Sequence, residues 1–417
     1  LVPFIHAVAE RCKAEGVRKI FFVSREGLIL KTIYNEIAPL VFGQDAPEAV
    51  YFGASRLTTF LASIQGDSYG LREMASAFSN TGHYSLRNLV QPLHIDEPLL
   101  KEIAAESGVV DIDSPLPPHF MTWPPLAAFL RDKRFRAIVK LRSEAARAGL
   151  LGYLEEIGFF HGGRVAFVDV GWGAQIQENL SVAIEHHPKR PQIRGIYLGL
   201  NATAHVRKTP DNWMEWVLCD AGHPEYFGRA ALEFVFLFEV MTRAPHGTII
   251  GYGEQEAHFA PICKGDETAS RRTEMLDEAQ IGAVQQGVHS YARHYARVAK
   301  LLNMHANDAL PYARSMMARV VRFPSTTEAD WLMKVRNISD LGSAETSTLG
   351  AAALSLRHPR QMVNTLRRSF WPYGVVGKSL GKVGQAAVAF KKGKHILPSL
   401  QTPLVPWIVW HAEAPAM

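Results

Sequence analysis

Two short segments of the chain join an apolar strand pattern to a polar, glycine-containing turn that could bind an anion. In the first, residues 165–180, a β-branched and aromatic run ends at Asp169 and is followed by Gly171 and Gly173, and an amphipathic helix pattern starts near Ala174. This order places a carboxylate at a strand end and free backbone N–H groups at a helix start, where anions are favoured. A plain βα turn, in which the glycines relieve crowding and Asp169 caps the helix, is the alternative.

The second segment lies near the start of the chain and has the same construction. Residues 19–37 show an apolar strand, a polar Ser-Arg-Glu-Gly turn at 24–27, and apolar residues at helical spacing. Another short strand pattern, residues 50–53, precedes Ser55 and Arg56. Because ligands of open α/β sheets bind beyond the carboxyl ends of the strands, these turns predict one common site.

The predicted site would bind a phosphate or sugar phosphate. We expect Arg25 and Arg56 to hold phosphate oxygens, because guanidinium groups bind them through two hydrogen bonds, and Asp169 to bind a sugar hydroxyl or a magnesium ion (Mg²⁺). These three are the predicted catalytic residues. The predicted ligand-binding residues are Ser24, Glu26, Gly27, Ser55, Gly171, Trp172, Gly173, Gln175 and His246. An ion pair of each arginine with an acid at the rim is the alternative.

Composition favours a globular protein with a sizeable core. The 417 residues are 47% hydrophobic and 20% charged. The cysteines Cys12, Cys219 and Cys263 lie far apart without metal-ligand spacing, which favours reduced thiols in a cytoplasmic protein. There is no signal-peptide pattern, and no apolar run reaches the ~18 residues of a membrane span. Because the sequence starts at Leu1 and not at a methionine, we expect a fragment of a longer protein.

The net charge of +5 is unevenly distributed along the chain. Residues 346–412 contain no acid and nine cations, so with Glu413 the tail carries +8 and residues 1–345 carry −3. Basic residues interleaved with aromatic ones suit an anionic membrane or an acidic partner, and a solvated basic linker is the alternative. Nucleic acid is disfavoured because no recognised binding module accompanies the charge.

The alternation of helix and strand patterns predicts the α/β class. We expect a Rossmann-like three-layer α/β/α fold with a mostly parallel sheet, plus a helical C-terminal region. The predicted core spans residues 1–260 and contains a helical insertion at 57–154. A helical region at 261–345 and a basic, partly flexible tail at 346–417 follow.

Three other features suggest chemistry but have simpler interpretations. Asp111 and Asp113 have the spacing of aspartyl phosphatases, yet the Pro- and Asp-rich loop around them predicts a solvated turn. Residues 289–295 place two histidines and two tyrosines at helical spacing without a third metal ligand, which favours a half-buried packing face. The apolar helix pattern at 231–241 carries Glu239, which must face a polar pocket or a partner.

Several separated motifs resemble a known bacterial family. Residues 21–27, Ser55-Arg56, 168–177, 233–251 and 323–329 are similar to predicted hydrolases of the haloacid-dehalogenase (HAD) superfamily, which are often encoded among, or fused to, glycosyltransferases for surface polysaccharides. The resemblance covers roughly residues 1–345. It implies a cytoplasmic HAD-like protein of capsule or O-antigen biosynthesis. A glycosyltransferase is the implied partner, and the basic tail would provide peripheral contact with the inner membrane.

The chain departs from that family at the expected nucleophile. The hydrolase activity of such proteins depends on an upstream Asp-x-Asp segment, and no comparable segment follows a strand here. We therefore expect the downstream α/β module, acting as a hydrolase or transferase on a phosphorylated sugar or nucleotide if it is catalytic. One alternative is a non-catalytic module that docks a glycosyltransferase at the membrane. The other is a phosphoribosyltransferase-like enzyme, although those usually carry two adjacent acids where this chain has Val168 and Asp169.

Overall fold

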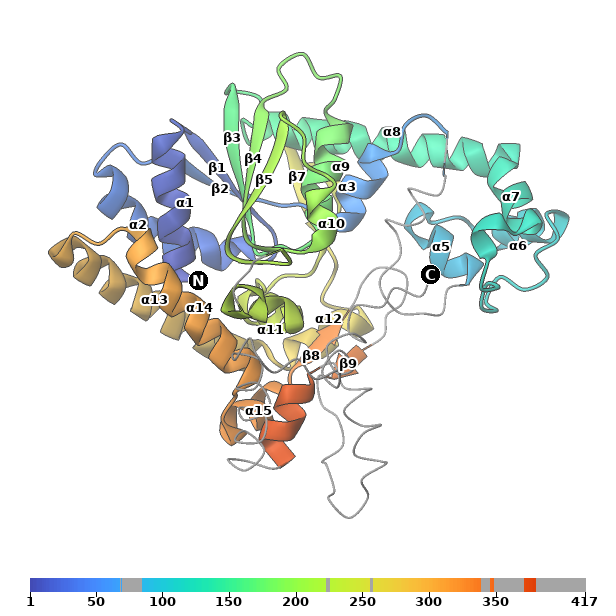
Figure 1. Cartoon of the computed structure of the whole chain (residues 1–417). Coiled ribbons are helices and arrows are strands. Elements are labelled where there is room, and N and C mark those ends of the chain that lie inside the picture. The colour runs from blue at the N-terminus through green and yellow to red at the C-terminus, as the bar shows by residue number, and fades with distance from the viewer. Residues whose placement is uncertain are drawn as a thin grey trace.

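The protein is built around a five-stranded parallel sheet with the strand order β2-β1-β3-β4-β5 (Figure 1). The computed structural model describes residues 1–67, 69, 85–222, 226–255, 258–338, 346–348 and 371–379. The strands are β1 (Lys19–Val23), β2 (Glu48–Phe52), β3 (Arg164–Asp169), β4 (Gln192–Leu200) and β5 (Asn212–Asp220). Helices cover both faces of the sheet, which confirms the predicted Rossmann-like three-layer α/β/α class.

The two faces of the sheet belong to two hydrophobic cores, because successive strand residues point in opposite directions. Phe21 and Phe167 pack on one face, and Phe22 and Val168 pack on the other. The first face is covered by α3 (Arg56–Ser63), the second half of α8 (Lys133–Glu156) and α9 (Gln175–Ala183). The second face is covered by α1 (Val2–Ala14), α2 (Gly27–Phe42), α13 (Glu278–Leu302) and α14 (Ala306–Arg322).

The chain changes direction across the sheet between β1 and β3. From β1 it passes through α2 to β2 at one edge, whereas β3, β4 and β5 follow one another toward the other edge. The connecting helices α2 and α9 lie on opposite faces. Such a topological switch point is where open α/β sheets bind ligands. The turns predicted to form the site, residues 24–27 and 170–174, adjoin at this point.

A helical insertion between β2 and β3 has a hydrophobic core of its own, which includes Leu86, Ile103, Phe129 and Phe135. It contains α5 (Leu86–Val90), η1 (Gln91–Leu93), α6 (Glu97–Glu106), η2 (Phe120–Thr122), α7 (Pro124–Arg131) and the first half of α8. Figure 1 shows these elements at the far end of α8, away from the sheet. The insertion lies within the predicted range 57–154, although α3 and the second half of α8 pack in the main core.

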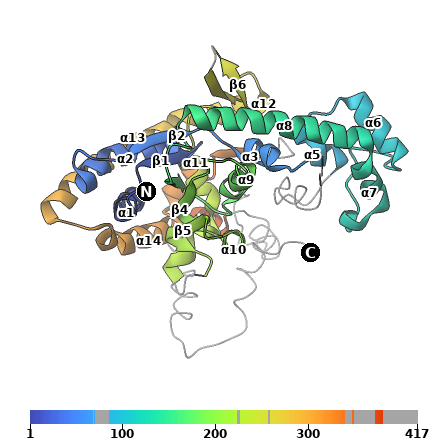
Figure 2. The same ribbon diagram turned by 90° about the horizontal axis from the view of Figure 1, so that it is seen from above.

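The remaining elements lie beyond β4 and join the sheet to the C-terminal helices. They are α10 (Ala202–His205), η3 (Tyr226–Glu233), α11 (Val235–Thr242), β6 (Ile249–Gln255), β7 (His258–Cys263), α12 (Ala269–Met275), α15 (Thr326–Leu332), β8 (Arg336–Ile338) and β9 (Thr346–Thr348). The β6–β7 hairpin packs on α8 (Figure 2). The predicted boundary at 260/261 falls within β7, and the boundary at 345/346 separates β8 from its partner β9.

Part of the predicted basic tail packs firmly on the body. Trp371 is fully buried, its ring stacks on Phe234 with centroids 4.6 Å apart, and its indole N–H donates to the carbonyl of Val321 at 2.7 Å. Residues 349–370 and 380–417 of the tail lie outside the described residues. Among the described helices, none combines the length and the apolar character that a membrane span needs.

Candidate functional site

The turn after β1 is tied to the turn after β2 by a buried serine. The Ser24 hydroxyl donates to the carbonyl of Ala54 at 2.5 Å and accepts from the Ala54 N–H at 3.0 Å. The Ser24 N–H donates to the carbonyl of Phe52 at 2.9 Å. The donor and one of the two acceptor sites of this hydroxyl are therefore used within the fold, so Ser24 holds the two turns together.

Ser55 also has a structural role, and it places Arg56 at the rim. Its hydroxyl caps α3 by accepting from the Thr58 N–H at 3.2 Å, and it donates to the carbonyl of Ile249 at 2.7 Å. Arg56 is the first residue of α3 and is exposed. Its guanidinium makes no hydrogen bond or ion pair with any other residue that the structure describes. Arg56 is therefore available to an incoming anion.

Asp169 ends β3 at the switch point and is 7% exposed. One of its oxygens accepts from the Val170 N–H at 2.7 Å. Burial raises the pKa of Asp169 well above its ordinary value, the nearby charges of Glu26 and Glu239 add to this rise, and the backbone N–H bonds oppose it. This carboxyl therefore retains its proton to higher pH than an ordinary aspartate and can donate a hydrogen bond when protonated.

Glu239 on α11 is the third carboxyl of the group. Burial raises the pKa of Glu239 to about 7, and the charge of Glu26 contributes to the rise. The charge of Arg56, the nearby indole of Trp172 and the charge of Arg25 act in the opposite direction. Carboxyls from three separate elements thus interact at the switch point, with one exposed arginine beside them.

The loop between Asp169 and α9 approaches its neighbours closely. At Gly171, which has φ +143°, a β-carbon would lie 2.2 Å from the carbonyl oxygen of Gly199 on β4. The Gly173 carbonyl accepts from Arg207 at 2.7 Å, and Trp172 packs edge-on against Phe238. Glycine at 171 is therefore required by the backbone geometry.

The first turn of α9 offers backbone donors to the same region. Ala174 precedes the helix in the left-handed conformation, with φ +56°, and makes no side-chain capping bond. Gln175 is the first helical residue, as the sequence pattern predicted to within one position. The N–H groups of this turn therefore face the loop without a capping side chain, in the arrangement that favours anions.

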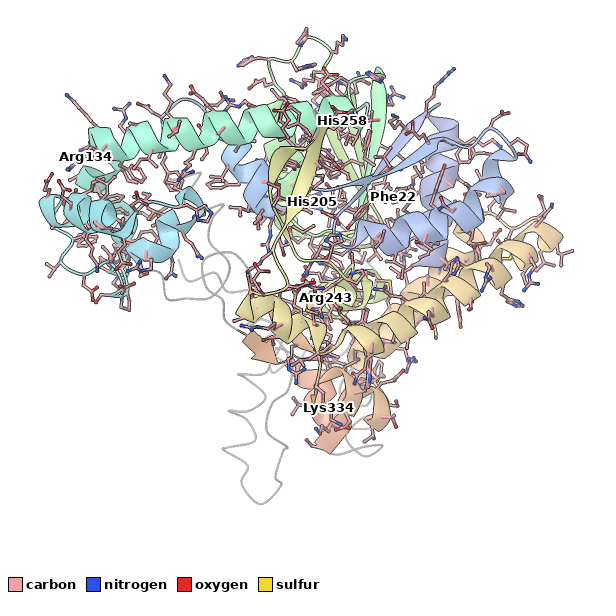
Figure 3. All side chains as sticks on the ribbon, turned by 180° about the vertical axis from the view of Figure 1, so that it is seen from behind. Phe22, Arg134, His205, Arg243, His258 and Lys334 are labelled. Carbon is pink, nitrogen blue, oxygen red and sulfur yellow. The ribbon has the colours of Figure 1, made fainter. Side chains whose placement is uncertain are left out.

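Arg25 is not free, because it forms a bidentate ion pair with Glu274 of α12. The two guanidinium nitrogens donate to the Glu274 oxygens at 2.7 and 2.8 Å, and the side chains are 16% and 5% exposed. Arg271 and Arg243 also approach Glu274, at 3.4 and 3.8 Å. Figure 3 shows Arg243 between the sheet and the C-terminal helices. An ion pair was the alternative role for Arg25, and the structure selects it, with Glu274 in place of Glu26 or Asp169 as the partner.

His246, a predicted ligand-binding residue, contacts Tyr51, Arg25 and Cys263, which the sequence did not indicate as its partners. Its Nε2 lies 2.6 Å from the hydroxyl of Tyr51, and its carbonyl accepts from Arg25 at 3.4 Å. Cys263 Sγ lies 3.8 Å from Nδ1 of His246. Burial raises the pKa of Cys263, so this thiol stays protonated near neutral pH and is a poor nucleophile.

Gly27 completes the first turn by allowing α2 to start against β1. A β-carbon at this position would lie 2.4 Å from the carbonyl carbon of Phe22. Glu26, the residue before it, is the N-cap of α2 and is half-buried. The turn thus places the Glu26 carboxylate near Asp169, while Arg25 binds Glu274.

The Asp111–Asp113 loop and the histidines and tyrosines at 289–295 make contacts that stabilise the fold. Asp113 binds Arg87 through both oxygens at 2.6 and 3.1 Å in an exposed loop. Tyr295 is buried and hydrogen-bonds His6, and His289 binds Glu36 at 2.8 Å. Within the described parts of the chain, no group of three or more His, Cys, Asp or Glu side chains is arranged to hold a metal ion.

One cavity lies away from the switch point. It has a volume of about 270 Å³ and is lined by Gln65, Arg147, Leu151, Ala183, His186, His187 and Pro188. Because α9 begins at the carboxyl edge of the sheet and ends at Ala183, this cavity adjoins the opposite end of the helix.

No protein-family model matches the chain, and no curated protein matches it significantly. The functional argument therefore depends on the geometry of the site. Sequence reasoning missed Tyr51 and Glu274 as neighbours of the predicted residues. The only signal for Glu239 was its position in an apolar helix pattern.

The raised carboxyl pKa values predict that stability falls as pH rises through neutrality. A carboxyl with a folded-state pKa of about 7 and an ordinary value of 4.5 binds more protons in the folded state between these values, so its stabilising contribution is lost as pH rises through about 7. Urea unfolding from pH 5.5 to 8.5 should show this decrease in the free energy of unfolding. In Glu239→Gln the decrease should be smaller by on the order of 2 kcal/mol. Glu254→Gln, at an exposed position of β6, is the control. An equal pH slope in both variants would contradict the assignment.

Proposed function

We propose that the switch point between β1 and β3 binds a phosphorylated sugar or nucleotide, such as a sugar phosphate or a nucleotide sugar. The observation that carries this proposal is the convergence of Glu26, Asp169 and Glu239 with the exposed Arg56 at the carboxyl edge of the sheet. Open α/β sheets bind their ligands at this place, and such ligands combine an anionic group with several hydroxyls.

In this proposal, cationic and N–H groups bind the phosphate of the ligand, and carboxyl groups bind its sugar. Arg56 and the N–H groups of the first turn of α9 would bind phosphate oxygens. Glu26 would accept hydrogen bonds from sugar hydroxyls. Asp169 and Glu239 would accept such bonds or, when protonated, donate them. Because Arg25 is held by Glu274, its contribution is to position the turn and not to contact phosphate.

Mg²⁺ is the candidate cofactor, and Asp169 would be its protein ligand. Mg²⁺ commonly binds one or two carboxylates and completes its coordination with waters and substrate phosphates. The carboxylate oxygens of Asp169 and Glu26 fit this requirement, and an ion would offset the repulsion between these acids and a phosphate. When bound, it would neutralise phosphate charge. The protein's own part is to hold Asp169 at the end of β3, Glu26 in the turn after β1 and Arg56 at the start of α3, after β2.

The resemblance to HAD-superfamily proteins supports a place in the assembly of surface polysaccharides, in the cytoplasm, beside a glycosyltransferase. The residue after β1 is Ser24, whose hydroxyl proton is donated to the Ala54 carbonyl, and not an aspartate. This observation favours the second candidate function, a module that binds the ligand, or docks the glycosyltransferase, without aspartyl-phosphate chemistry.

Calorimetric titration with nucleotide sugars, sugar phosphates and phosphoribosyl pyrophosphate, with and without Mg²⁺, tests the proposal. We expect binding of at least one of them, weakened about 10- to 100-fold by Arg56→Ala, which removes a charge-assisted hydrogen bond. Asp169→Asn should remove the dependence on Mg²⁺. Arg131→Ala, at an exposed arginine of the insertion, should change the affinity less than about twofold.

Two outcomes would count against ligand binding at the switch point. One is the absence of heat and of thermal stabilisation with every ligand, which would favour the docking module. The other is full affinity in the double variant Arg56→Ala, Asp169→Asn, which would place the ligand elsewhere, with the cavity beside Arg147 as the next candidate.

A further inference from the structure

The end of the α13–α14 hairpin exposes two adjacent leucines that no other described element covers. Leu301 is 83% exposed and Leu302 is 67% exposed. They form the last turn of α13, just before the left-handed residue Asn303 ends the helix. Figures 1 and 2 both show this turn at an outer edge of the molecule. Apolar side chains exposed together at a projecting turn indicate a surface that can enter an apolar environment.

Cations line the same side of α13. Arg293, Arg297 and Lys300 are exposed, and none of them forms an ion pair or hydrogen bond with another residue in the described ranges. The spacing i, i+4, i+7 and i+8 puts them on one helical face together with Leu301. The opposite face, formed by Ala292, Tyr295 and Ala299, is buried against the core.

The charge of this face is not balanced by neighbouring acids. Residues 279–307 contain no Asp or Glu. The acids that border the segment already have partners: Glu36 binds His289 at 2.8 Å, and Glu10 binds His305 at 3.0 Å. Asp308 accepts from the backbone N–H of His305 at 2.8 Å. The outer face of α13 is therefore a row of uncompensated positive charge that ends in an apolar tip.

We propose that the outer face of α13 docks on an anionic lipid surface, with Leu301 entering the boundary between headgroups and acyl chains. Arg293, Arg297 and Lys300 would lie against the anionic headgroups. A nucleic acid would satisfy the three cations but would leave Leu301 in water. Because the hairpin lies outside residues 346–417, this surface acts independently of the basic tail and of the proposed ligand site.

Co-sedimentation of the full chain with phosphatidylcholine vesicles, with and without phosphatidylserine, tests this surface. We expect binding only to the anionic vesicles and a decrease at high salt. The triple variant Arg293→Gln, Arg297→Gln, Lys300→Gln should lower the partition coefficient about 100-fold, or about fivefold for each charge. Leu301→Ser should lower it about tenfold, whereas Leu302→Ser, on the other side of the helix, should change it less.

A matched control separates this surface from general electrostatic attraction. Arg131→Gln, Lys133→Gln removes two exposed cations from the insertion and should change the partition coefficient less than about twofold. A polarity-sensitive fluorophore on Leu301→Cys should shift to the blue on anionic vesicles. A Cys263→Ser background confines the label to this position, because Cys12 and Cys219 are buried. Absence of vesicle binding, or unchanged binding by the triple variant and by Leu301→Ser, would overturn the proposal and assign any remaining attraction to the tail.

Discussion

Gly171→Ala is expected to destabilise the protein by about 3 kcal/mol or more. The added β-carbon would lie 2.2 Å from the Gly199 carbonyl oxygen, and this oxygen belongs to the backbone of β4. A backbone atom in a paired strand cannot move away as the end of a flexible side chain can. The backbone at Gly171 also has φ +143°, which side chains of L residues rarely tolerate. The steric and conformational costs therefore act together.

Chemical denaturation of the variant, compared with Gly163→Ala, measures this effect. Gly163 lies just before β3, and a β-carbon there meets no atom within 4 Å. The control should change the free energy of unfolding by less than about 1 kcal/mol. Because the loop also holds the site, Gly171→Ala should weaken binding of any switch-point ligand even where the protein stays folded. Equal midpoints for the two variants would show that the loop does not approach β4 in this way.

Glu274→Gln is expected to cost about 3–5 kcal/mol, because it removes the anion from a buried group of cations. The Glu274 side chain is 5% exposed and lies within 4 Å of the guanidinium groups of Arg25, Arg271 and Arg243. Glutamine keeps the shape but leaves these positive charges facing one another. The substitution also releases the turn after β1 from α12, so we expect the ligand affinity to change with stability.

The matched control is Asp113→Asn, which removes a bidentate arginine partner from an exposed loop. Exposed ion pairs contribute little, so its unfolding midpoint should stay close to that of the unmodified protein. A similar small effect for Glu274→Gln would contradict the importance of the buried cluster.

The pH dependence of the Glu274 effect provides a second test. Burial raises the pKa of Glu274, but the hydrogen bonds from Arg25 and the charges of the three arginines together outweigh burial and leave the pKa below its ordinary value of 4.5. Such a carboxylate stabilises the fold above its unfolded-state pKa and loses this contribution as pH falls through the folded-state pKa. The difference between the unmodified protein and Glu274→Gln should therefore shrink in acid.

The sequence alone predicted the strands β1 and β3, whose turns border the site. The apolar run before Ser24 and the one that ends at Asp169 predicted β1 and β3, because short β-branched and aromatic runs bounded by polar turns form buried parallel strands. β1 has the predicted bounds, and β3 begins one residue before the prediction. The placement of their turns at one edge followed from the geometry of parallel strands.

The predictions for other parts of the chain were less complete. In the packing face predicted at 289–295, Tyr295 is buried and His289 is partly buried, whereas Tyr291 and His294 are exposed. The hairpin strand β7 was not predicted, because its residues do not alternate regularly between apolar and polar. The resemblance to HAD-superfamily proteins, the polysaccharide role, the glycosyltransferase partner and the tail's membrane contact stay hypotheses.

Local pattern therefore determined where the strands, turns and flanking helices of this protein form, since these depend on residues within one or two turns of each other. Only the tertiary structure decided which charges meet. Arg25 binds Glu274, which lies 249 residues away, and Glu239 joins Asp169 because α11 packs beside the switch point. The strength of an ion pair and the pKa of a carboxyl depend on burial and on neighbours brought from distant parts of the chain, and no local pattern encodes these quantities.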